Sequence, residues 1–103
     1  MECDHHLDFF VIIAGQKEKK ALVTLIIQIG ARVINTIYGR GSIKANSFTD
    51  VFGLVPEENK IIITSLISSD KSGNLIEILN KEFNFNKPNT GIAFTIPVKG
   101  LSY

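Results

Sequence analysis

Several signals that would assign a protein to a class are scarce or absent in this sequence. Its 103 residues include one cysteine, Cys3, so no disulfide can form within one chain, and the cytoplasm is the expected compartment. No apolar run approaches the ~20 residues of a membrane-spanning helix. The first residues, MECDHHLDFF, have neither the basic start nor the small-residue cleavage site of a signal peptide. The formal net charge of +1 is too small to attract nucleic acid, so no nucleic-acid partner is expected.

Catalytic and metal-binding motifs are missing as well. The sequence contains no Ser/His/Asp order, no catalytic Cys/His pair and no complete phosphate loop, so we expect a protein that is not an enzyme. Cys3, His5 and His6 are metal-ligand types, but adjacent histidines on an extended chain point to opposite sides. No metal site is predicted, although a gathering of these residues around the axis of an oligomer stays open.

The pattern that is present is that of one α+β domain covering residues 1–103. Hydrophobic residues make up 45% of the chain and charged residues 20%, which is typical of a globular domain. The predicted elements are strands at 7–14, 32–38, 60–68 and 91–98, a helix within 16–30, and a helix at 72–83 with Asp70 or Ser72 as its cap. Two right-handed crossovers in this βαββαβ order predict a ferredoxin-like sandwich, a four-stranded antiparallel sheet with both helices on one face.

Both faces of that sheet are apolar in the sequence. In this architecture helices cover only one face of the sheet. The other face would expose an apolar surface of roughly several hundred Å² to water. Association with identical copies is the usual remedy. We expect Phe10→Asp or Ile62→Asp to break the assembly, because burying an unpaired carboxylate costs about several kcal/mol. The alternating sets are Leu7, Phe9, Val11 and Ile13 against Phe10, Ile12 and Ala14, and Ile61 and Ile63 against Ile62 and Leu66.

An unusually long segment separates the second and third strands. Residues 39–59, GRGSIKANSFTDVFGLVPEEN, take the place of a tight hairpin, and loops beyond ~12–15 residues are usually functional. Gly39, Arg40 and Gly41 would allow backbone N–H groups and a guanidinium to approach an anion. A hairpin whose hydrophobic residues fold back onto the body explains the same segment without a ligand.

Two stretches, GARVINTIYGRGS at 30–42 and NKPNTGIAFTIPV at 86–98, resemble the nitrogen-regulatory PII signal-transduction proteins, and more closely a short PII-like branch. The resemblance implies a homotrimer whose sheets face inward, and a T-loop at 39–59 that docks on a nitrogen-metabolism enzyme or a membrane transporter. It also implies clefts between subunits that bind ATP or ADP, with 2-oxoglutarate on some members. The implied ligand-binding residues are Gly39, Arg40, Gly41, Lys87, Asn89, Thr90 and Gly91, and the implied partner-binding residues are Ser42, Lys44, Phe48, Asp50, Phe52 and Leu54.

Departures from the family pattern change the expected effector. Typical members carry Gly-Asp-Gly-Lys in the B-loop, and here the same place has Asn89, Thr90, Gly91 and Ile92, so isoleucine replaces the phosphate-binding lysine. The C-terminal arginines and the uridylylated tyrosine of typical members have no counterpart. One charged contact contributes about 1.5–3 kcal/mol, or roughly ten- to a hundred-fold in affinity. We expect no uridylylation, weak or absent ATP binding, no further cofactor, and a smaller or less charged anionic effector.

Other functions of the same fold are less consistent with the sequence. An RNA-binding version needs stacking aromatic residues on the middle strands, and 60–68 has none. A metallochaperone needs Cys-x-x-Cys, which one cysteine excludes. An amino-acid-binding ACT-like module and a trimeric metal-responsive protein of this fold remain as alternatives, with the long segment at 39–59 counting against the ACT-like module.

Overall fold

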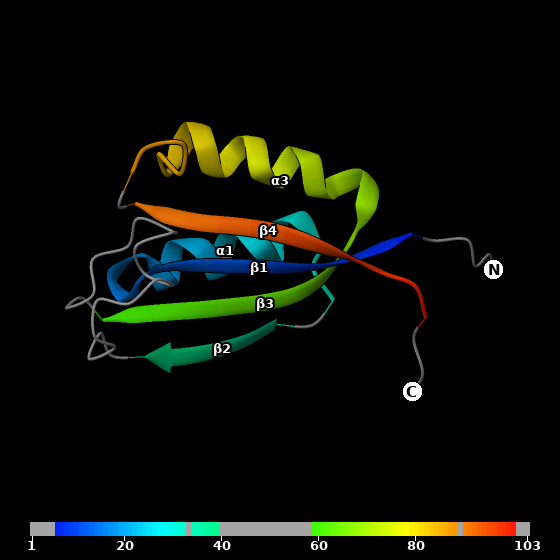
Figure 1. Ribbon diagram of the computed structural model, residues 1–103, viewed down its shortest axis with the longest axis horizontal. Coiled ribbons are helices and arrows are strands. Elements are labelled where there is room, and N and C mark those ends of the chain that lie inside the picture. Colours follow the sequence, from blue (N-terminus) through cyan, green and yellow to red (C-terminus); the bar gives the residue numbers. More distant parts are fainter. Residues whose placement is uncertain (1–5, 33, 40–58, 89, 101–103) are drawn as a thin grey trace.

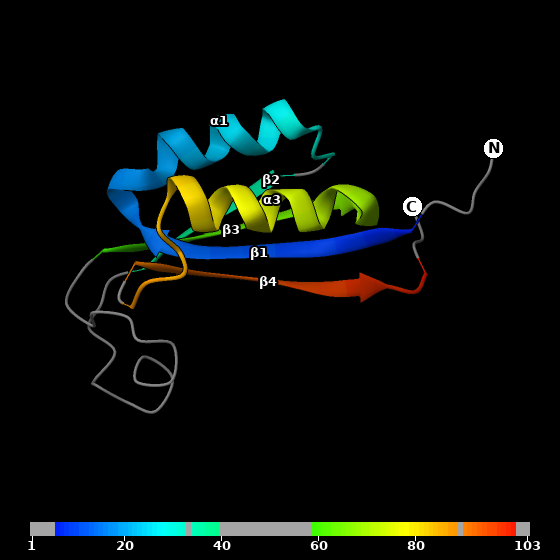
Figure 2. The same ribbon diagram turned by 90° about the horizontal axis from the view of Figure 1, so that it is seen from above.

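The computed structural model describes residues 6–32, 34–39, 59–88 and 90–100, with no account of the side chain of Ile34. They form one antiparallel sheet in the order β2-β3-β1-β4, with both helices on the same face (Figures 1 and 2). The predicted ferredoxin-like arrangement is confirmed. Its elements are β1 (Leu7–Gly15), the 3-10 turn η1 (Gln16–Glu18), α1 (Lys19–Ile29), β2 (Ile34–Gly39), β3 (Lys60–Ser68), α3 (Ser69–Glu82) and β4 (Gly91–Val98).

The ends of α1 follow from local chemistry. The first three residues of the predicted helix form the 3-10 turn, and the α-helix begins at Lys19. Its C-terminal cap is Gly30, whose φ of 96° is a left-handed conformation that glycine adopts without steric cost. The Gly30 N–H donates to the carbonyls of Ile26 and Ile27. Leu22 and Ile26 are buried, so the periodicity identified the inward face correctly.

The start of α3 differs from the sequence prediction. The helix begins at Ser69 rather than at residue 72, and Ser68 occupies the cap position in an extended conformation, so neither Asp70 nor Ser72 is the cap. Asp70 lies in the first turn instead, where a carboxylate interacts favourably with the helix dipole. The Ser69 N–H donates to the His6 carbonyl at 2.8 Å, which ties the helix start to the residue before β1.

The main core lies between the sheet and the two helices. Its members from β1 and β3 point toward α1 and α3, and Val23, Leu25, Ile29 and Ile76 pack around them at partial exposure. Burial of this apolar surface is the main stabilising contribution, at ~25 cal/mol per Å². The buried members are Phe10, Ile12, Ala14, Leu22, Ile26, Ile61, Ile63, Ile67, Leu75 and Leu79.

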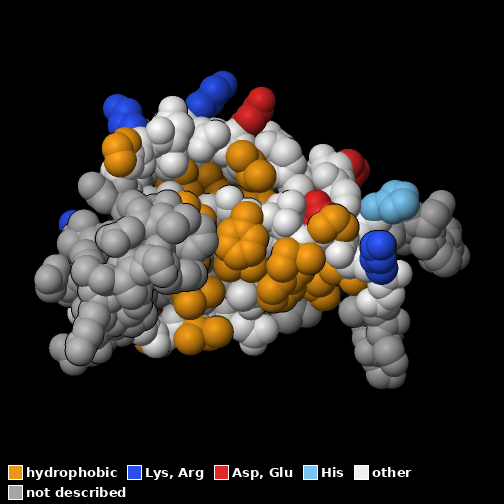
Figure 3. Space-filling model, viewed as in Figure 1, with side chains coloured by type: hydrophobic (Ala, Val, Ile, Leu, Met, Phe, Trp, Pro, Cys, Tyr) orange, Lys and Arg blue, Asp and Glu red, His pale blue; other side chains and the backbone are white. Residues whose placement is uncertain are grey.

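The opposite face of the sheet carries a second apolar cluster. Val11 and Ile13 are buried there, with Phe9, Ile62 and Ile92 packed around them. The register extends this face, because Phe94 and Ile96 of β4 stand opposite Val11 and Phe9, and they are 37% and 49% exposed. Figure 3 shows hydrophobic side chains gathered over the strands on this side, and the described helices α1 and α3 both lie on the other side (Figure 2). We call these residues the open sheet face.

One sequence expectation about the two faces is wrong. Phe10 was expected to contribute to the assembly surface, and it is instead 0% exposed among residues that face the helices. Ile62 does lie on the open sheet face. The alternation identified two apolar sets correctly, but it did not show which set the helices cover.

Candidate functional site

The strand register brings the two predicted ligand-binding segments to the same end of the sheet. Gly39, the last residue of β2, pairs with Lys60 at the start of β3, and Lys60 pairs with Gly15 at the end of β1. Gly91, the first residue of β4, pairs with Ala14, one step inward. The segment after Gly39 and the turn before Gly91 therefore leave the sheet at one common end.

At that end the two segments occupy opposite edges. The order β2-β3-β1-β4 places two strands between β2 and β4. Neighbouring strands are ~4.8 Å apart, so Gly39 and Gly91 are separated by about 14 Å. A single phosphate or carboxylate cannot contact both strand ends of one chain. A single small anion could contact both ends if the β2 edge of one chain faced the β4 edge of another.

A lysine of α1 contacts the β2 edge of the sheet. The ammonium of Lys19, at the start of α1, lies 5.2 Å from the centroid of the Tyr38 ring, within the range of a cation–π interaction. Tyr38 is 55% exposed, so this contact contributes about 0.5–1 kcal/mol. It fixes the residue directly before Gly39. Sequence reasoning missed Lys19, because a cation–π pair between a helix and a strand leaves no periodic signal.

On the β4 edge, the turn before Gly91 has a defined hydrogen-bonding pattern. The Lys87 N–H donates to the Asn84 carbonyl at 2.9 Å, and the Thr90 hydroxyl donates to the Pro88 carbonyl at 3.4 Å. Lys87 is exposed, Thr90 is half-buried and Gly91 is buried. The other predicted residues lie outside the described part of the chain: Arg40, Gly41 and Asn89 for the ligand, and Ser42, Lys44, Phe48, Asp50, Phe52 and Leu54 for the partner.

Ile92 stands where the resemblance places the phosphate-binding lysine. Its strand position turns it onto the open sheet face, opposite Ile13, and it packs against the cluster of Val11 and Ile13. An isoleucine here adds apolar contact area and supplies no charge. The charge that a bound anion requires must therefore come from elsewhere at this end of the sheet.

A small hollow lies at the same end, between the close of β1 and the start of β3. Gly15, Gln16, Lys17 and Asn59 line about 260 Å³. The Gln16 N–H donates to the Asn59 carbonyl at 3.1 Å, which holds the two segments together. Lys17 is an exposed cation beside this hollow that sequence reasoning did not select. Lys17 provides positive charge near the strand ends, but the hollow beside it is not an enclosed pocket.

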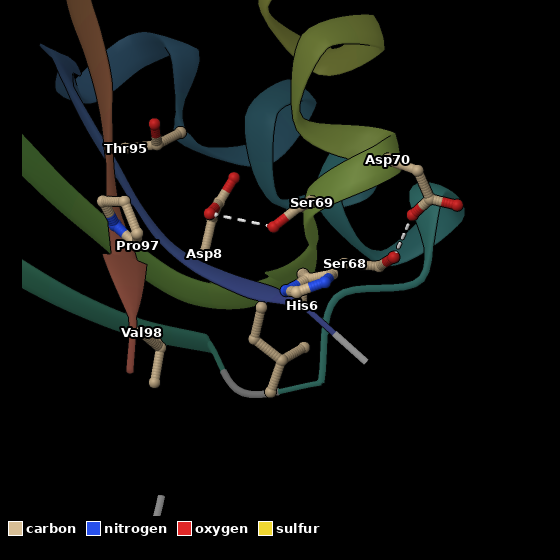
Figure 4. A pocket seen from close by; sticks show the side chains of 9 residues that line it. His6, Asp8, Ser68, Ser69, Asp70, Thr95, Pro97 and Val98 are labelled. Atoms are coloured by element: carbon tan, nitrogen blue, oxygen red, sulfur yellow. Dashed lines mark hydrogen bonds between the residues drawn. The ribbon is translucent and has the colours of Figure 1, made fainter. Parts of the chain in front are cut away.

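A larger hollow lies at the other end of the sheet, where sequence reasoning predicted no site (Figure 4). It measures about 810 Å³. Asp8 of β1 accepts hydrogen bonds from the hydroxyls of Ser69 at 3.0 Å and Ser72 at 2.7 Å. Ser68 donates to Asp70. The carboxylates are thus engaged with the first turn of α3. The lining residues are His6, Leu7, Asp8, Ser68, Ser69, Asp70, Thr95, Pro97 and Val98.

Asp8 is expected to stabilise the fold through this contact. Asp8→Ala should lower the free energy of unfolding by about 1–3 kcal/mol, because Ser72 is only 5% exposed and its hydroxyl would lose its partner. Ser69→Ala removes one donor and leaves the other, so its effect should be smaller, at about 0.5–1.5 kcal/mol. Urea denaturation at fixed protein concentration measures both. Equal stability of Asp8→Ala and the unmodified chain would show that the contact contributes nothing.

Within 6–32, 34–39, 59–88 and 90–100, no three His, Cys, Asp or Glu side chains gather in a way that could hold a metal ion. Cys3 and His5 lie outside these ranges. None of the helices described there has the length and apolar character needed to cross a membrane.

Comparison of the sequence with protein-family models and with curated proteins finds no match. Comparison with solved structures finds a PII-like signalling protein from Thermus thermophilus, with a TM-score of 0.67 and 20% identity over 91% of this chain and 87% of that one. The chain has the fold of the PII-like proteins. The resemblance carried by residues 30–42 and 86–98 is therefore confirmed at the level of the fold.

Two further PII-like structures were solved with small anions. CPII from Thiomonas intermedia, bound to ADP, AMP and acetate, matches with a TM-score of 0.64 and 20% identity over 93% of this chain and 91% of CPII. PII from Arabidopsis thaliana, bound to citrate, matches with a TM-score of 0.62 and 16% identity over 92% of this chain and 79% of that one. The PII-like fold thus accounts for nearly the whole chain.

Proposed function

We propose that this chain is a PII-like regulatory protein. It forms a homotrimer, binds a small anionic metabolite or nucleotide in clefts between subunits, and controls a target protein through residues 39–59. The observation that supports the proposal is that Gly39 and Gly91, which border the two expected ligand-binding segments, lie at one end of the sheet but on opposite edge strands. Edge strands of two neighbouring subunits could bring such a pair together in one site.

The open sheet face supports the oligomeric part of the proposal. Apolar side chains from β1, β3 and β4 form a continuous surface there, and Phe94 and Ile96 are partly exposed in the single chain. Covering these side chains with identical surfaces would remove them from water at ~25 cal/mol per Å². The number three comes from the resemblance to the PII family.

The expected effector is small and anionic. The structural neighbours include CPII with ADP, AMP and acetate, CPII with ADP, AMP and bicarbonate, and a plant PII with citrate. Phosphate, carboxylate and bicarbonate all suit backbone N–H groups combined with an arginine such as Arg40. Because Ile92 replaces the usual lysine, the site offers one cation fewer, and the ligand with the most phosphates should be disfavoured.

The regulated target is expected to be an enzyme of nitrogen metabolism or a membrane transporter. The segment 39–59 begins with Gly39, the last residue of β2, at the end of the sheet where the ligand is expected. An effector bound beside Gly39 would therefore contact the start of the segment that is expected to dock on the target. Effector binding and target binding would then be coupled through this segment.

Calorimetry with AMP, ADP, ATP, a cyclic nucleotide and 2-oxoglutarate tests the ligand part of the proposal. AMP or ADP should bind more tightly than ATP, and Arg40→Ala should weaken binding roughly tenfold or more, because one charged hydrogen bond is lost. Lys20→Ala, which removes an exposed lysine from α1, is the matched control and should leave the affinity unchanged. Tight ATP binding that Arg40→Ala does not affect would refute the proposed cleft.

A further inference from the structure

An aromatic ring occupies the space that a side chain at residue 91 would need. A Cβ atom placed on Gly91 would lie 2.5, 2.7 and 2.9 Å from the Cζ, Cε1 and Cε2 atoms of Phe85. Real Cβ atoms essentially never come so close to another heavy atom. Among the described residues, Gly30 is the only glycine with a positive φ, so the backbone conformation of Gly91 does not by itself require glycine. The ring of Phe85 is what requires glycine at this position.

The ring of Phe85 is itself held in place by the end of α3. The N–H groups of Phe83 and Phe85 both donate to the Leu79 carbonyl, each at 3.1 Å. Between them Asn84 has a φ of 60°, a left-handed conformation that asparagine tolerates better than most residues. The two phenyl rings meet edge to face with centroids 6.3 Å apart. Phe85 also packs against the main core, so it cannot swing away from Gly91 at low cost.

Phe85 and Gly91 lie at the two ends of one turn, and their contact holds these two ends together. Lys87 and Thr90, two of the residues expected to face a ligand, belong to this turn, and their hydrogen bonds to Asn84 and Pro88 are local. We propose that Phe85 is the positioning residue of the turn: its ring, seated on Gly91, fixes where Lys87 and Thr90 stand. The role of this turn in anion binding rests on the proposed function, whereas the packing of Phe85 on Gly91 does not depend on it.

A double-mutant cycle tests the contact. Gly91→Ala should lower the melting temperature by roughly 5–20 °C, because the added methyl collides with the ring. Leucine has no Cε or Cζ atoms, so in the Phe85→Leu background the same Gly91→Ala change should cost much less. Ile29→Val is the control, since it trims a partly buried side chain of the same cluster and leaves the Phe83–Phe85 pair of rings unchanged, and the full penalty of Gly91→Ala should persist there. Equal penalties in all three backgrounds would overturn the proposal.

Amide hydrogen exchange tests the positioning itself. Phe85→Leu should raise the exchange rate of the Lys87 N–H by roughly tenfold or more, because the turn loses its anchor, and Ile29→Val should not. An unchanged Lys87 rate in Phe85→Leu would overturn the positioning role.

Titration of ADP then separates the two proposals. If the unmodified protein binds no ADP, the effector proposal fails for this nucleotide, and the cycle and the exchange still decide the role of Phe85. If ADP binds and Phe85→Leu leaves its affinity unchanged, the turn is not part of the site.

Discussion

Ile62→Asp is expected to convert the trimer into folded monomers. Ile62 belongs to the cluster on the open sheet face, and its neighbours there are Ile13, directly opposite in the register, and Val11. Assembly would bury one unpaired carboxylate per subunit, at a cost of about several kcal/mol each. The single chain would keep its fold, because the main core on the other face is untouched. Analytical ultracentrifugation should give the mass of one chain, and circular dichroism should be unchanged.

The matched control for this substitution is Ile27→Asp. Ile27 is an isoleucine of the same size on α1, and it is 60% exposed. A carboxylate there stays in water and should leave both the trimer and the fold intact. A trimer that survives Ile62→Asp would show that the open sheet face is not the assembly surface. Dissociation by Ile27→Asp would place that surface on the helices instead.

Phe10→Asp is expected to prevent folding altogether. Phe10 neighbours Phe9 in β1 but points the other way, and it is 0% exposed in the main core. Removal of a buried phenylalanine side chain costs about 3–5 kcal/mol, and the buried carboxylate adds about several kcal/mol more. The sum falls within the ~5–15 kcal/mol by which domains are stable, so it is large enough to remove the stability of a domain of this size. Circular dichroism should show a chain without its native helices and strands.

Phe10→Leu separates the loss of packing from the buried charge. It keeps an apolar side chain in the core and should cost about 1–2 kcal/mol, so the protein should remain folded and trimeric. A folded but monomeric Phe10→Asp would mean that this side chain lies on the assembly surface, as the sequence alone had suggested. The two aspartate variants, at positions 10 and 62, thus assign the two faces of the sheet independently.

The fold was predictable from the sequence because its periodicities are strong. Six segments with clear apolar patterns and the order βαββαβ leave few ways to arrange the chain. The covered face was not predictable in the same way. Phe9 and Phe10 are identical in type, and only the direction of the crossovers and the register of β1 with its neighbours show which one meets the helices.

The start of α3 was missed for a related reason. Ser68, Ser69 and Asp70 have the composition of a loop, and the pattern of apolar residues begins only later. What extends the helix to Ser69 is a carboxylate far away in the sequence, Asp8, which accepts hydrogen bonds from Ser69 and Ser72. Such a long-range contact leaves no local signal.

The sequence predicted which segments form the candidate site, but it did not predict the contacts that hold these segments in place. Glycines at 39 and 91 stood out because they flank strands beside polar turns. The need for glycine at 91 has a cause that the sequence does not show, since Phe85 is six positions away and its ring meets Gly91 only in the folded chain. The contact of Lys19 with Tyr38 is likewise a product of tertiary packing.

A titration of ADP into the unmodified protein and into Ile62→Asp tests the central claim most directly. The β2 and β4 ends of one chain are about 14 Å apart, and the proposed site joins the β2 edge of one subunit to the β4 edge of another. Calorimetry should therefore show binding to the trimer, saturating at one ADP per chain, and no binding to the folded monomer. Equal binding of ADP by the Ile62→Asp monomer, or no binding of ADP by the trimer, would contradict a nucleotide site between subunits.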